Sequence, residues 1–223
     1  MPASEFIYGR NSVSEAKRGR RGVRRVITAD DVPPDELTRL AGSPDHQGVV
    51  AEVDVYRYAD PAALLEGGSG LIVALDQVQD PRNLGAVCRS AEAAGAAGVV
   101  ITERRAAQVT PAAAKASAGA VEHLDVARVR NLADWLAEAK DAGAWVYGAD
   151  ASAPQRYDEI DLVGGLAVLV LGGEGKGLRP RVAASCDALV SIPLAGRVDS
   201  LNVSAAATVL LFEAVRQRGT AAP

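Results

Sequence analysis

Three loops of the sequence have the residue types that bind and orient a ligand, and each follows an apolar, strand-like run. They are DQVQDPRNLGAVCRSA at 76–91, LVLGGEGKGL at 169–178 and IPLAGRVDSLNVS at 192–204. Glycine lets the backbone approach a ligand closely, and amide, hydroxyl and charged side chains can hold a reacting group by hydrogen bonds. In a parallel sheet, ligands bind at the carboxyl ends of the strands. The three loops therefore predict a binding site.

Single residues in these loops have more than one interpretation. Arg89 lies about 140° from Leu84 on a helical wheel, so the apolar stripe does not bury it. It is either a plain surface arginine or a group that faces a ligand. Asn83 could be only a helix cap. Ser200 and Asn202 both precede a long apolar helix, which needs one cap and not two.

The glycine loop at 169–178 matches neither of the common nucleotide-binding motifs. A Walker A loop requires Ser or Thr after its lysine, whereas Lys176 is followed by Gly177. A dinucleotide fingerprint requires a third glycine where Leu178 stands, and it belongs in the first strand–helix unit of the domain. The loop is therefore a backbone-lined site of another kind or a simple turn.

The elements that must position these loops alternate between strand and helix after residue 70. Nearly continuous apolar runs, as expected of strands covered on both faces, predict strands at 71–76, 98–102, 144–150, 166–172 and 187–193. Helical spacing predicts helices at 83–95, 111–119, 131–143 and 202–218. We expect N-caps at Asn83 and Asn131 and C′ glycines at Gly95 and Gly143. The alternation predicts an α/β domain with a mostly parallel sheet.

The N-terminal part reads as a small α/β module. We expect strands at 23–28 and 48–56 and a helix at 11–18, capped near Asn11 or Ser12. So short a segment has little core of its own and should lean on another part of the chain. ADPAALLEGGSG at 59–70 looks like a linker. The expected organisation is a small module at 1–58, a linker at 59–70 and a main domain at 71–223.

Composition places the chain among ordinary soluble proteins. Its 223 residues are 48% hydrophobic and 23% charged, with a formal net charge of −4. Cys88 and Cys186 lack C-x-x-C spacing, which indicates a reducing compartment and no zinc site. The longest aliphatic run, at 166–171, is too short to span a bilayer, and the N-terminus has no apolar leader. We expect a cytoplasmic protein with no membrane partner.

One basic stretch departs from this overall acidity. KRGRRGVRR, residues 17–25, contains six basic residues and no acidic one. It is either a solvated surface or a phosphate-contacting patch, because clustered Lys and Arg bind nucleic acid whatever the net charge. On the second interpretation the candidate RNA contacts are Lys17, Arg18, Arg20 and Arg21.

Together the three loops resemble the signature motifs of the SpoU/TrmH family, of the SPOUT superfamily, of S-adenosylmethionine-dependent RNA ribose 2′-O-methyltransferases. They occur in the family's order and spacing, and SAGAVEHLDVARVRNL at 117–132 extends the resemblance over nearly all of 71–218. IYGRNSVSEA at 7–16 and HQGVVAEV at 46–53 resemble the ends of a ribosomal-protein-L30e-like domain. That domain belongs to the branch that methylates a guanosine of large-subunit (23S) ribosomal RNA. The segment between the two ends is short, which predicts a module lacking one helix and one strand.

The resemblance implies a fold, a cofactor and an assembly. The main domain would be an α/β knot, in which the C-terminal segment threads through a loop in a trefoil. S-adenosylmethionine would sit in the knot, no metal would be required, and a homodimer would complete each RNA site. By position in the motifs, the cofactor-binding residues would be Gly172, Gly173, Gly175, Ile192, Pro193 and Leu201. The catalytic residues would be Asn83, Arg89, Glu174, Ser200 and Asn202, and His46 would contact RNA or the interface between domains.

The implied reaction is an in-line attack of a ribose 2′-oxygen on the cofactor's methyl group. A guanidinium stays protonated in proteins, so we expect Arg89 to stabilise the developing alkoxide rather than act as a base. The proton would leave through water or phosphate. Two other functions remain open at this stage: a transfer RNA ribose 2′-O-methyltransferase, and a non-catalytic RNA-binding or ribosome-assembly protein.

Overall fold

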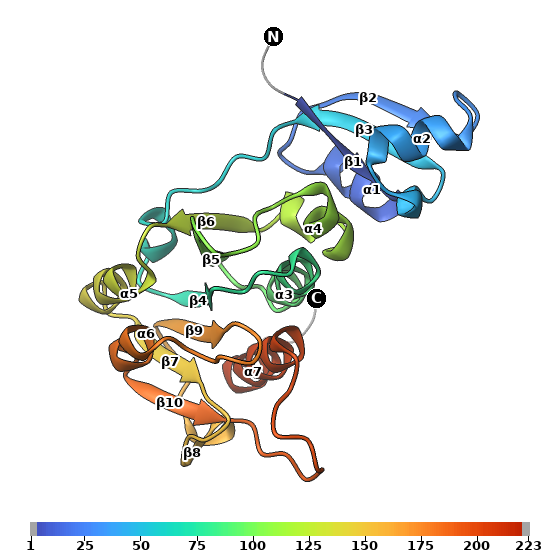
Figure 1. Ribbon diagram of the computed structural model, residues 1–223. Coiled ribbons are helices and arrows are strands. Elements are labelled where there is room, and N and C mark those ends of the chain that lie inside the picture. The colour runs from blue at the N-terminus through green and yellow to red at the C-terminus, as the bar shows by residue number, and fades with distance from the viewer. Residues whose placement is uncertain (1–3, 220–223) are drawn as a thin grey trace.

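The computed structural model describes residues 4–219, which form a small sheet and a large one (Figure 1). The small sheet is antiparallel with the order β1-β3-β2. Its strands are β1 (Ser4–Tyr8), β2 (Val23–Thr28) and β3 (Val49–Asp54). Its helices are α1 (Arg10–Arg18), α2 (Pro34–Ala41) and the short 3-10 helix η1 (Pro44–His46). We call this unit the N-terminal module.

The large sheet has seven strands in the order β6-β5-β4-β9-β7-β10-β8, and every pairing is parallel. The strands are β4 (Gly70–Asp76), β5 (Gly98–Thr102), β6 (Asp125–Val129), β7 (Trp145–Ala149), β8 (Gln155–Arg156), β9 (Leu166–Gly172) and β10 (Ala188–Ser191). The expected α/β class and mostly parallel sheet are therefore confirmed. The threading of the C-terminal segment through a knot stays a prediction.

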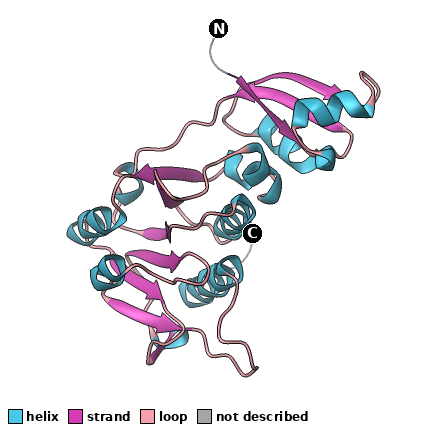
Figure 2. Cartoon of the chain, in the orientation of Figure 1, coloured by secondary structure: helices cyan, strands magenta, loops and turns pink. Residues whose placement is uncertain are grey.

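Helices cover both faces of the large sheet (Figures 1 and 2). The helices are α3 (Pro81–Ala93), α4 (Pro111–Ala116), α5 (Leu132–Asp141), α6 (Pro180–Ser185) and α7 (Val203–Arg218), with the short 3-10 helices η2 (Ala63–Leu65), η3 (Ala120–Glu122) and η4 (Tyr157–Glu159). One core joins α3, α4 and α7, and the other joins α5 and α6. Leu71, Val73 and Leu75 of β4 enter the first core, whereas Ile72 and Ala74 enter the second. Burial on both sides explains the continuous apolar run of this strand.

Some elements escaped the sequence analysis. The five expected strands of the main domain are confirmed, but β1, β6, α2 and α6 were not expected. In β6, an edge strand, Asp125 and the exposed Arg128 interrupt the apolar run. An edge strand can carry such residues because it pairs on one side only, and this weakens its sequence signal.

The caps were partly predicted. Asn131 caps α5, accepting from the Ala133 N–H at 3.2 Å, as expected. Gly95 and Gly143 have φ of 68° and 87° just past their helices, which confirms both as C′ residues. The expected cap at Asn83 is wrong: α3 begins two residues earlier, and Asp80 caps it, accepting from the Arg82 N–H at 2.8 Å.

The expected cap of the first helix is also wrong, and the reason lies in the packing of α1. This helix starts after Gly9 with no side-chain cap. Ser12, one of the two expected caps, is buried and donates to the carbonyl of Ala114 in α4 at 3.1 Å. Its hydroxyl therefore ties the N-terminal module to the main domain.

The N-terminal module leans on the main domain, as its size predicts. Ile7, Val13 and Val53 belong to the same buried cluster as α3 and α4. The segment 59–70 is not a free tether, because Ala59 forms a bridge to β6 and Leu64 is buried in the second core. No helix in the described part of the chain is long and apolar enough to cross a membrane.

Candidate active site

The crevice between β4 and β9 is where a parallel sheet of this order should bind a ligand. The two strands are neighbours, but α3, which follows β4, packs on one face and α6, which follows β9, packs on the other. The two connections therefore diverge at the carboxyl ends of the strands and leave a crevice there. The Gly173 N–H donates to the carbonyl of Asp76 at 2.9 Å, so the two loops touch at the base of this crevice.

The glycine loop after β9 is tightly folded, and its glycines are required by contacts. A Cβ on Gly172 would lie 2.1 Å from the carbonyl carbon of Gly177, and one on Gly173 would lie 2.6 Å from the carbonyl oxygen of Gln77. Gly175 and Gly177 have φ of 74° and 61°. A side chain would clash at the first two positions and strain the backbone at the last two. The loop is therefore a built structure rather than a loose turn.

Three polar side chains, one from each of the three loops, meet at this crevice. The Asn83 amide donates to the carboxylate of Glu174. The Asn202 amide donates to Asn83 Oδ1 at 3.1 Å and to Glu174 Oε1 at 3.2 Å. We call Asn83, Glu174 and Asn202 the polar cluster. Because Asp80 caps α3, the side chain of Asn83 is free to take part in it.

Asn202 has two tasks at once. Its Oδ1 accepts from the Ser204 N–H at 2.9 Å and so caps α7, while its Nδ2 holds the polar cluster. Ser200 is exposed and does not cap the helix. The pair of polar residues around Leu201 is therefore explained: Asn202 is the cap, and Ser200 lines the adjacent cavity.

Arg89 lies apart from the polar cluster. It sits two turns along α3, about 120° around the helix from Asn83. Its side chain is exposed and makes no hydrogen bond or ion pair with any residue from 4 to 219. The structure thus brings together three of the five expected catalytic residues and places Ser200 beside them, while the guanidinium of Arg89 remains free to turn toward a ligand.

Two cavities flank the glycine loop, which is their common wall. One, of about 430 Å³, lies between the loops after β4 and β9 and includes Asn83, Glu174 and Lys176 in its lining. The other, of about 370 Å³, lies between the loops after β7, β9 and β10 and the start of α7. Both volumes fall in the range of small-molecule sites. We call them the β4 cavity and the β10 cavity.

The β10 cavity suits S-adenosylmethionine. Five of the six expected cofactor residues line it: Gly172, Gly173, Gly175, Ile192 and Leu201. Pro193 is exposed and is not among the residues that line the cavity. Aliphatic side chains such as Leu171 and Ala206 offer an apolar surface, and the glycine loop offers unobstructed backbone groups. That combination fits a ligand with a flat base and a polar amino-acid end.

Sequence reasoning missed three residues at this site: Asp76, Arg179 and Asp150. Asp76 is fully buried and accepts from the Arg179 backbone N–H at 2.8 Å and from Arg179 Nε at 2.7 Å, which anchors the end of the glycine loop to β4. Asp150 lines the β10 cavity, and hydrogen bonds from Ser152 lower the pKa of its carboxyl. Asp76 ends β4, and Asp150 follows β7 directly. Their position at the carboxyl end of a buried strand could have identified both as site residues from the sequence.

The two cysteines are unsuited to nucleophilic chemistry. Burial raises the pKa of the Cys88 thiol to about 12, and mainly burial raises that of Cys186 to about 12. Neither is a thiolate near neutral pH, so neither can attack a substrate carbon. Within residues 4–219, no three His, Cys, Asp or Glu side chains are grouped so that they could hold a metal ion.

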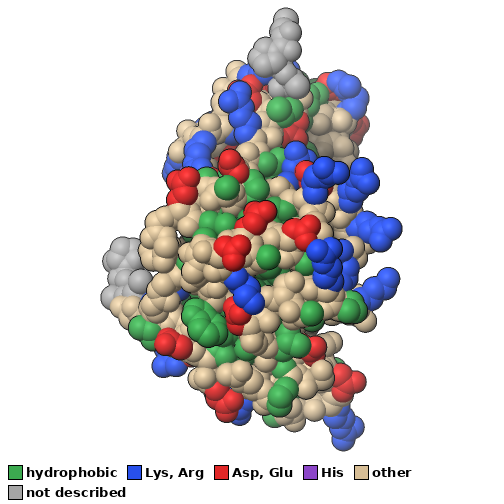
Figure 3. All heavy atoms as spheres, turned by 90° about the vertical axis from the view of Figure 1, so that its left-hand side faces the viewer, with side chains coloured by type: hydrophobic (Ala, Val, Ile, Leu, Met, Phe, Trp, Pro, Cys, Tyr) green, Lys and Arg blue, Asp and Glu red, His purple; other side chains and the backbone are tan. Residues whose placement is uncertain are grey.

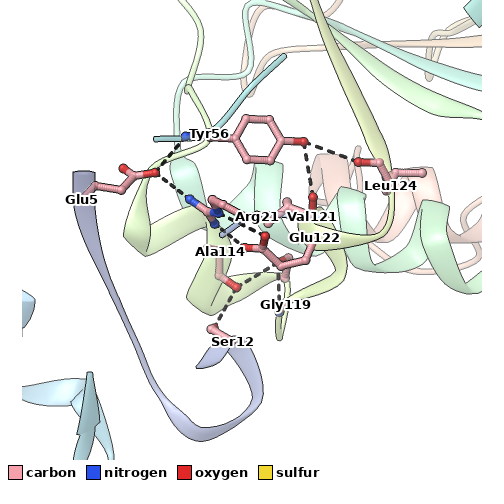
Figure 4. A network of polar contacts seen from close by, with 10 residues as sticks. Glu5, Ser12, Arg21, Tyr56, Ala114, Gly119, Val121, Glu122 and Leu124 are labelled. Carbon is pink, nitrogen blue, oxygen red and sulfur yellow. Dashed lines mark hydrogen bonds and ion pairs between the residues drawn. The ribbon is translucent and has the colours of Figure 1, made fainter. Parts of the chain in front are cut away.

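Arg20, Arg21 and Arg24 of the basic stretch pair with carboxylates of other elements, and Figure 4 shows the surroundings of Arg21. Arg21 is 6% exposed, and its guanidinium contacts Glu122, which is 1% exposed, and Glu5 at 2.6 Å. Arg20 pairs with Asp125 in β6. Tyr56, whose pKa is raised mainly by burial, donates to backbone carbonyls of the main domain. Arg21 is therefore part of an interface between module and main domain, contrary to its expected contact with RNA.

The remaining expected RNA contacts divide in two. Lys17 and Arg18 are exposed, although Arg18 pairs with Glu15 at 3.0 Å. His46 is 9% exposed, and its Nδ1 accepts from the Gly48 N–H at 3.1 Å while Nε2 lies 3.3 Å from the Thr38 hydroxyl. With both ring nitrogens occupied inside the module, His46 supports the turn before β3 and does not face RNA.

Comparison with known proteins gives a consistent result. Residues 70–212 match the model of the SpoU rRNA Methylase family. The chain is 46% identical over 241 residues to a protein of Bacillus subtilis named as a TrmH family tRNA/rRNA methyltransferase, YacO, with 96% of each chain covered. The aligned stretch is longer than this 223-residue chain, so the relative carries insertions that this chain lacks.

Solved structures extend the match over the module as well. The AdoMet-bound rRNA methyltransferase from Sinorhizobium meliloti has a TM-score of 0.84 at 28% identity and covers 96% of this chain and 87% of its own. The SpoU methyltransferase AviRb from Streptomyces viridochromogenes, in complex with AdoMet, has a TM-score of 0.82 at 27% identity and covers 98% and 92%. A TrmH/SpoU tRNA modifying enzyme of A. aeolicus covers only 71% of this chain, with a TM-score of 0.61 at 28% identity and 82% of its own length.

Proposed function

Because the chain belongs to the SpoU rRNA methylase family of S-adenosylmethionine-dependent RNA methyltransferases, we propose that it methylates a ribose 2′-oxygen of ribosomal RNA. The observation that carries the proposal is the polar cluster, in which all three signature loops meet beside a cavity that suits the cofactor. A decayed, non-catalytic relative would have no reason to keep this arrangement.

The cofactor site is assigned to the β10 cavity. Gly172, Gly173 and Gly175 would offer backbone groups to the cofactor, and Ile192 and Leu201 would pack against its base. Pro193, exposed beside Ile192, would shape the entrance. S-adenosylmethionine supplies an electrophilic methyl group when it is bound. Its leaving group is a neutral thioether, so the protein needs no general acid.

The reacting end is assigned to the polar cluster together with Ser200 and Arg89. Asn83 and Asn202 would orient the ribose, and Glu174 holds their two amides in position. Fixing the attacking oxygen in line supplies much of the rate enhancement. Arg89 would turn toward the RNA phosphate beside the ribose and stabilise the negative charge that develops on the 2′-oxygen. The proton would leave to water or phosphate, because a guanidinium cannot accept it.

The cysteines disfavour a pyrimidine ring carbon as the methyl acceptor. Methylation of a pyrimidine ring carbon commonly requires a thiolate that adds to the ring. Cys88 is fully buried, and both thiols have pKa values of about 12. A ribose hydroxyl needs no covalent partner, only alignment and charge stabilisation, which is what the polar cluster and Arg89 offer.

We assign the substrate to ribosomal RNA, with a guanosine of the 23S molecule as the target. The N-terminal module supports this choice, because the rRNA methyltransferase structure covers it and the tRNA modifying enzyme leaves more than a quarter of the chain unmatched. Lys17, Arg18 and Arg20, exposed on the module, would add a minor RNA contact. Transfer RNA is the second candidate, because the Bacillus subtilis relative carries both RNAs in its name.

We also propose a homodimer that acts in the cytoplasm. Phe212 is 46% exposed on α7, between the buried Leu211 and Glu213, so this helix has an apolar side chain outside its own core. A second copy packed on α7 would cover Phe212, which lies about 15 Å along the helix from Asn202 of the polar cluster. The two free cysteines agree with a reducing compartment.

Mapping of ribose methylation tests the proposed function. Total RNA from a strain lacking the gene is compared with RNA from the parent and from a complemented strain. We expect one guanosine of 23S rRNA to lose its 2′-O-methyl group and to regain it on complementation. Loss of a ribose methyl from a tRNA instead would transfer the assignment to the second candidate, and an unchanged map would refute both.

A further inference from the structure

Basic side chains are unevenly distributed over this molecule. Figure 3 shows the face that carries α5 and α6, where Lys and Arg gather along one margin while acidic and basic side chains mix over the centre. The segments that follow β4, β5 and β6, including the first turn of α3, contain four arginines that neither the site nor the module uses: Arg82, Arg104, Arg105 and Arg130.

These loops are continuous with the active-site crevice. The Glu103 N–H donates to the carbonyl of Val129 at 2.9 Å, which joins the end of β5 to the end of β6. The Ala107 N–H donates to the carbonyl of Val78 at 2.8 Å, which joins the loop after β5 to the loop after β4. The β4 loop in turn contacts the glycine loop through Gly173. From β6 to β9 this edge spans three strand spacings, or about 15 Å.

The four arginines are available to a ligand. All four side chains are exposed, and none makes an ion pair or side-chain hydrogen bond with the described part of the chain. Among the acidic residues nearby, Asp76 and Asp134 pair with Arg179 and Arg181. Glu103 is exposed, and the carboxylate of Asp80 accepts the cap hydrogen bond of α3. Four unpaired guanidinium groups against these last two carboxylates leave this edge positive, although the whole chain is negative.

The loop that carries Arg104 and Arg105 is held rigidly. The Thr102 hydroxyl donates to the carbonyl of Arg104 at 2.9 Å, and the Gln108 amide donates to the carbonyls of Thr102 and Ala106, both at 3.2 Å. Arg105 itself has φ of 58°, a left-handed conformation that costs a non-glycine residue free energy. A strained arginine whose side chain has no partner among residues 4–219 points to a partner outside the protein.

We propose that Arg104, Arg105 and Arg130, continued by Arg82, form a phosphate-binding strip that docks the substrate RNA along the carboxyl edge of β4, β5 and β6. The inference rests on the proposed function and names the surface through which that site receives RNA. Guanidinium forks bind phosphate oxygens in pairs. Phosphate contacts position an RNA without reading its sequence, so the strip sets register while the polar cluster holds the ribose.

A matched pair of double variants tests the strip. Arg104→Ala/Arg130→Ala removes two unpaired arginines, and Arg39→Ala/Arg156→Ala removes two exposed arginines that pair with neighbouring carboxylates. The charge change is the same. Binding of a 23S rRNA fragment and of bulk tRNA is measured by fluorescence anisotropy over a salt series, and cofactor binding is measured by calorimetry as a check on folding.

For the strip variant we expect at least tenfold weaker RNA binding. We also expect the slope of log K against log salt to be flatter by roughly 1.4–1.8, that is about 0.7–0.9 for each lost phosphate contact. Cofactor affinity and the control variant should match the wild type. Equal RNA affinity and slope in both variants would overturn the strip. Tighter binding of tRNA than of the 23S rRNA fragment by the wild-type protein would overturn the rRNA assignment instead. The strip would then be tested by comparing the two variants in their binding of tRNA.

The variant Arg105→Gly is a second, independent test of the strip. Glycine relieves the left-handed strain, so we expect a higher melting temperature together with RNA binding weakened severalfold. Arg105→Lys should keep most of the affinity, because the charge remains. Wild-type RNA affinity in Arg105→Gly would remove Arg105 from the strip.

Discussion

The two arginine-rich regions of this protein have opposite surroundings. In the basic stretch, Arg20 and Arg21 are paired with carboxylates of the main domain, and Arg24 pairs with Asp54 at 2.7 Å. At the carboxyl edge of the large sheet, Arg104 and Arg130 are exposed and pair with nothing in the described chain. The denser cluster in the sequence is therefore the less available one. Charge density along a chain does not predict binding; the position of the counter-charges in the fold does.

The same contrast separates the module interface from the active site. At the interface the polar groups satisfy one another, and the pair between Arg21 and Glu122 is almost wholly buried. At the site, the polar cluster opens onto two cavities, and the side chains of Arg89 and Ser200 have no hydrogen-bond or ion-pair partner among the described residues. The polar groups that pair with one another at the interface should govern the free energy of unfolding. The unpaired groups at the site should govern ligand binding and the rate of methyl transfer.

The largest expected effect is on the interface side. Glu122→Ala leaves the buried guanidinium of Arg21 with Glu5 as its remaining carboxylate, so unfolding should become easier by about 3–5 kcal/mol. Urea denaturation measures this. Glu36→Ala, which breaks the exposed pair with Arg39, is the control and should cost less than about 1 kcal/mol. If Glu122→Ala lowered the free energy of unfolding by less than about 1 kcal/mol, the buried pair would stabilise the protein no more than the exposed pair does, and the contrast between interface and surface would not hold.

On the site side, Asn83→Ala should have the converse effect. It removes the amide that bonds to both Glu174 and Asn202, so the ribose would be misplaced and methyl transfer should fall by about 10- to 100-fold. Stability should change by less than about 1 kcal/mol, because Glu174 and Asn202 are exposed and can bond to water. Single-turnover rates and urea melts measure the two quantities. Wild-type turnover would exclude Asn83 from the reacting end.

The smallest effect should come from the exposed part of the basic stretch. Lys17→Ala/Arg18→Ala removes two surface charges, one of them already paired with Glu15. We expect RNA affinity to fall by threefold or less and stability to change by under about 1 kcal/mol. A drop in affinity as large as that of Arg104→Ala/Arg130→Ala would reverse the comparison between the two regions.

The meeting of the three signature loops was easier to predict from the sequence than the packing of the module. Glu174 and the two asparagines lie in the loops that follow buried strands, so their meeting at one edge follows from the parallel sheet. The resemblance to the SpoU/TrmH motifs supplied the roles that we propose for them. The cap at Asn83 was wrong because Asp80 competes for the same task, and only the start of α3 decides between them.

The module could not be predicted in the same way. Glu122 lies 101 positions from Arg21, and no local pattern links them. Arg21 thus looked like a surface residue in a basic run, and His46 looked like a binding residue, because the burial of both depends on tertiary packing. Between β2 and β3 the structure has α2 and η1, and the expected loss of one helix and one strand relative to the family's module stays a prediction.

The central claim, that this site methylates a ribose 2′-oxygen with help from Arg89, is tested most directly by locating a transferred methyl group. RNA is incubated with the enzyme and methyl-labelled S-adenosylmethionine and then hydrolysed with alkali, which cannot cleave next to a 2′-O-methylated ribose. We expect the label in alkali-resistant dinucleotides, with a rate that falls about 10²–10³-fold in Arg89→Ala at unchanged cofactor affinity. Label on bases in mononucleotides, or a wild-type rate in Arg89→Ala, would contradict the account.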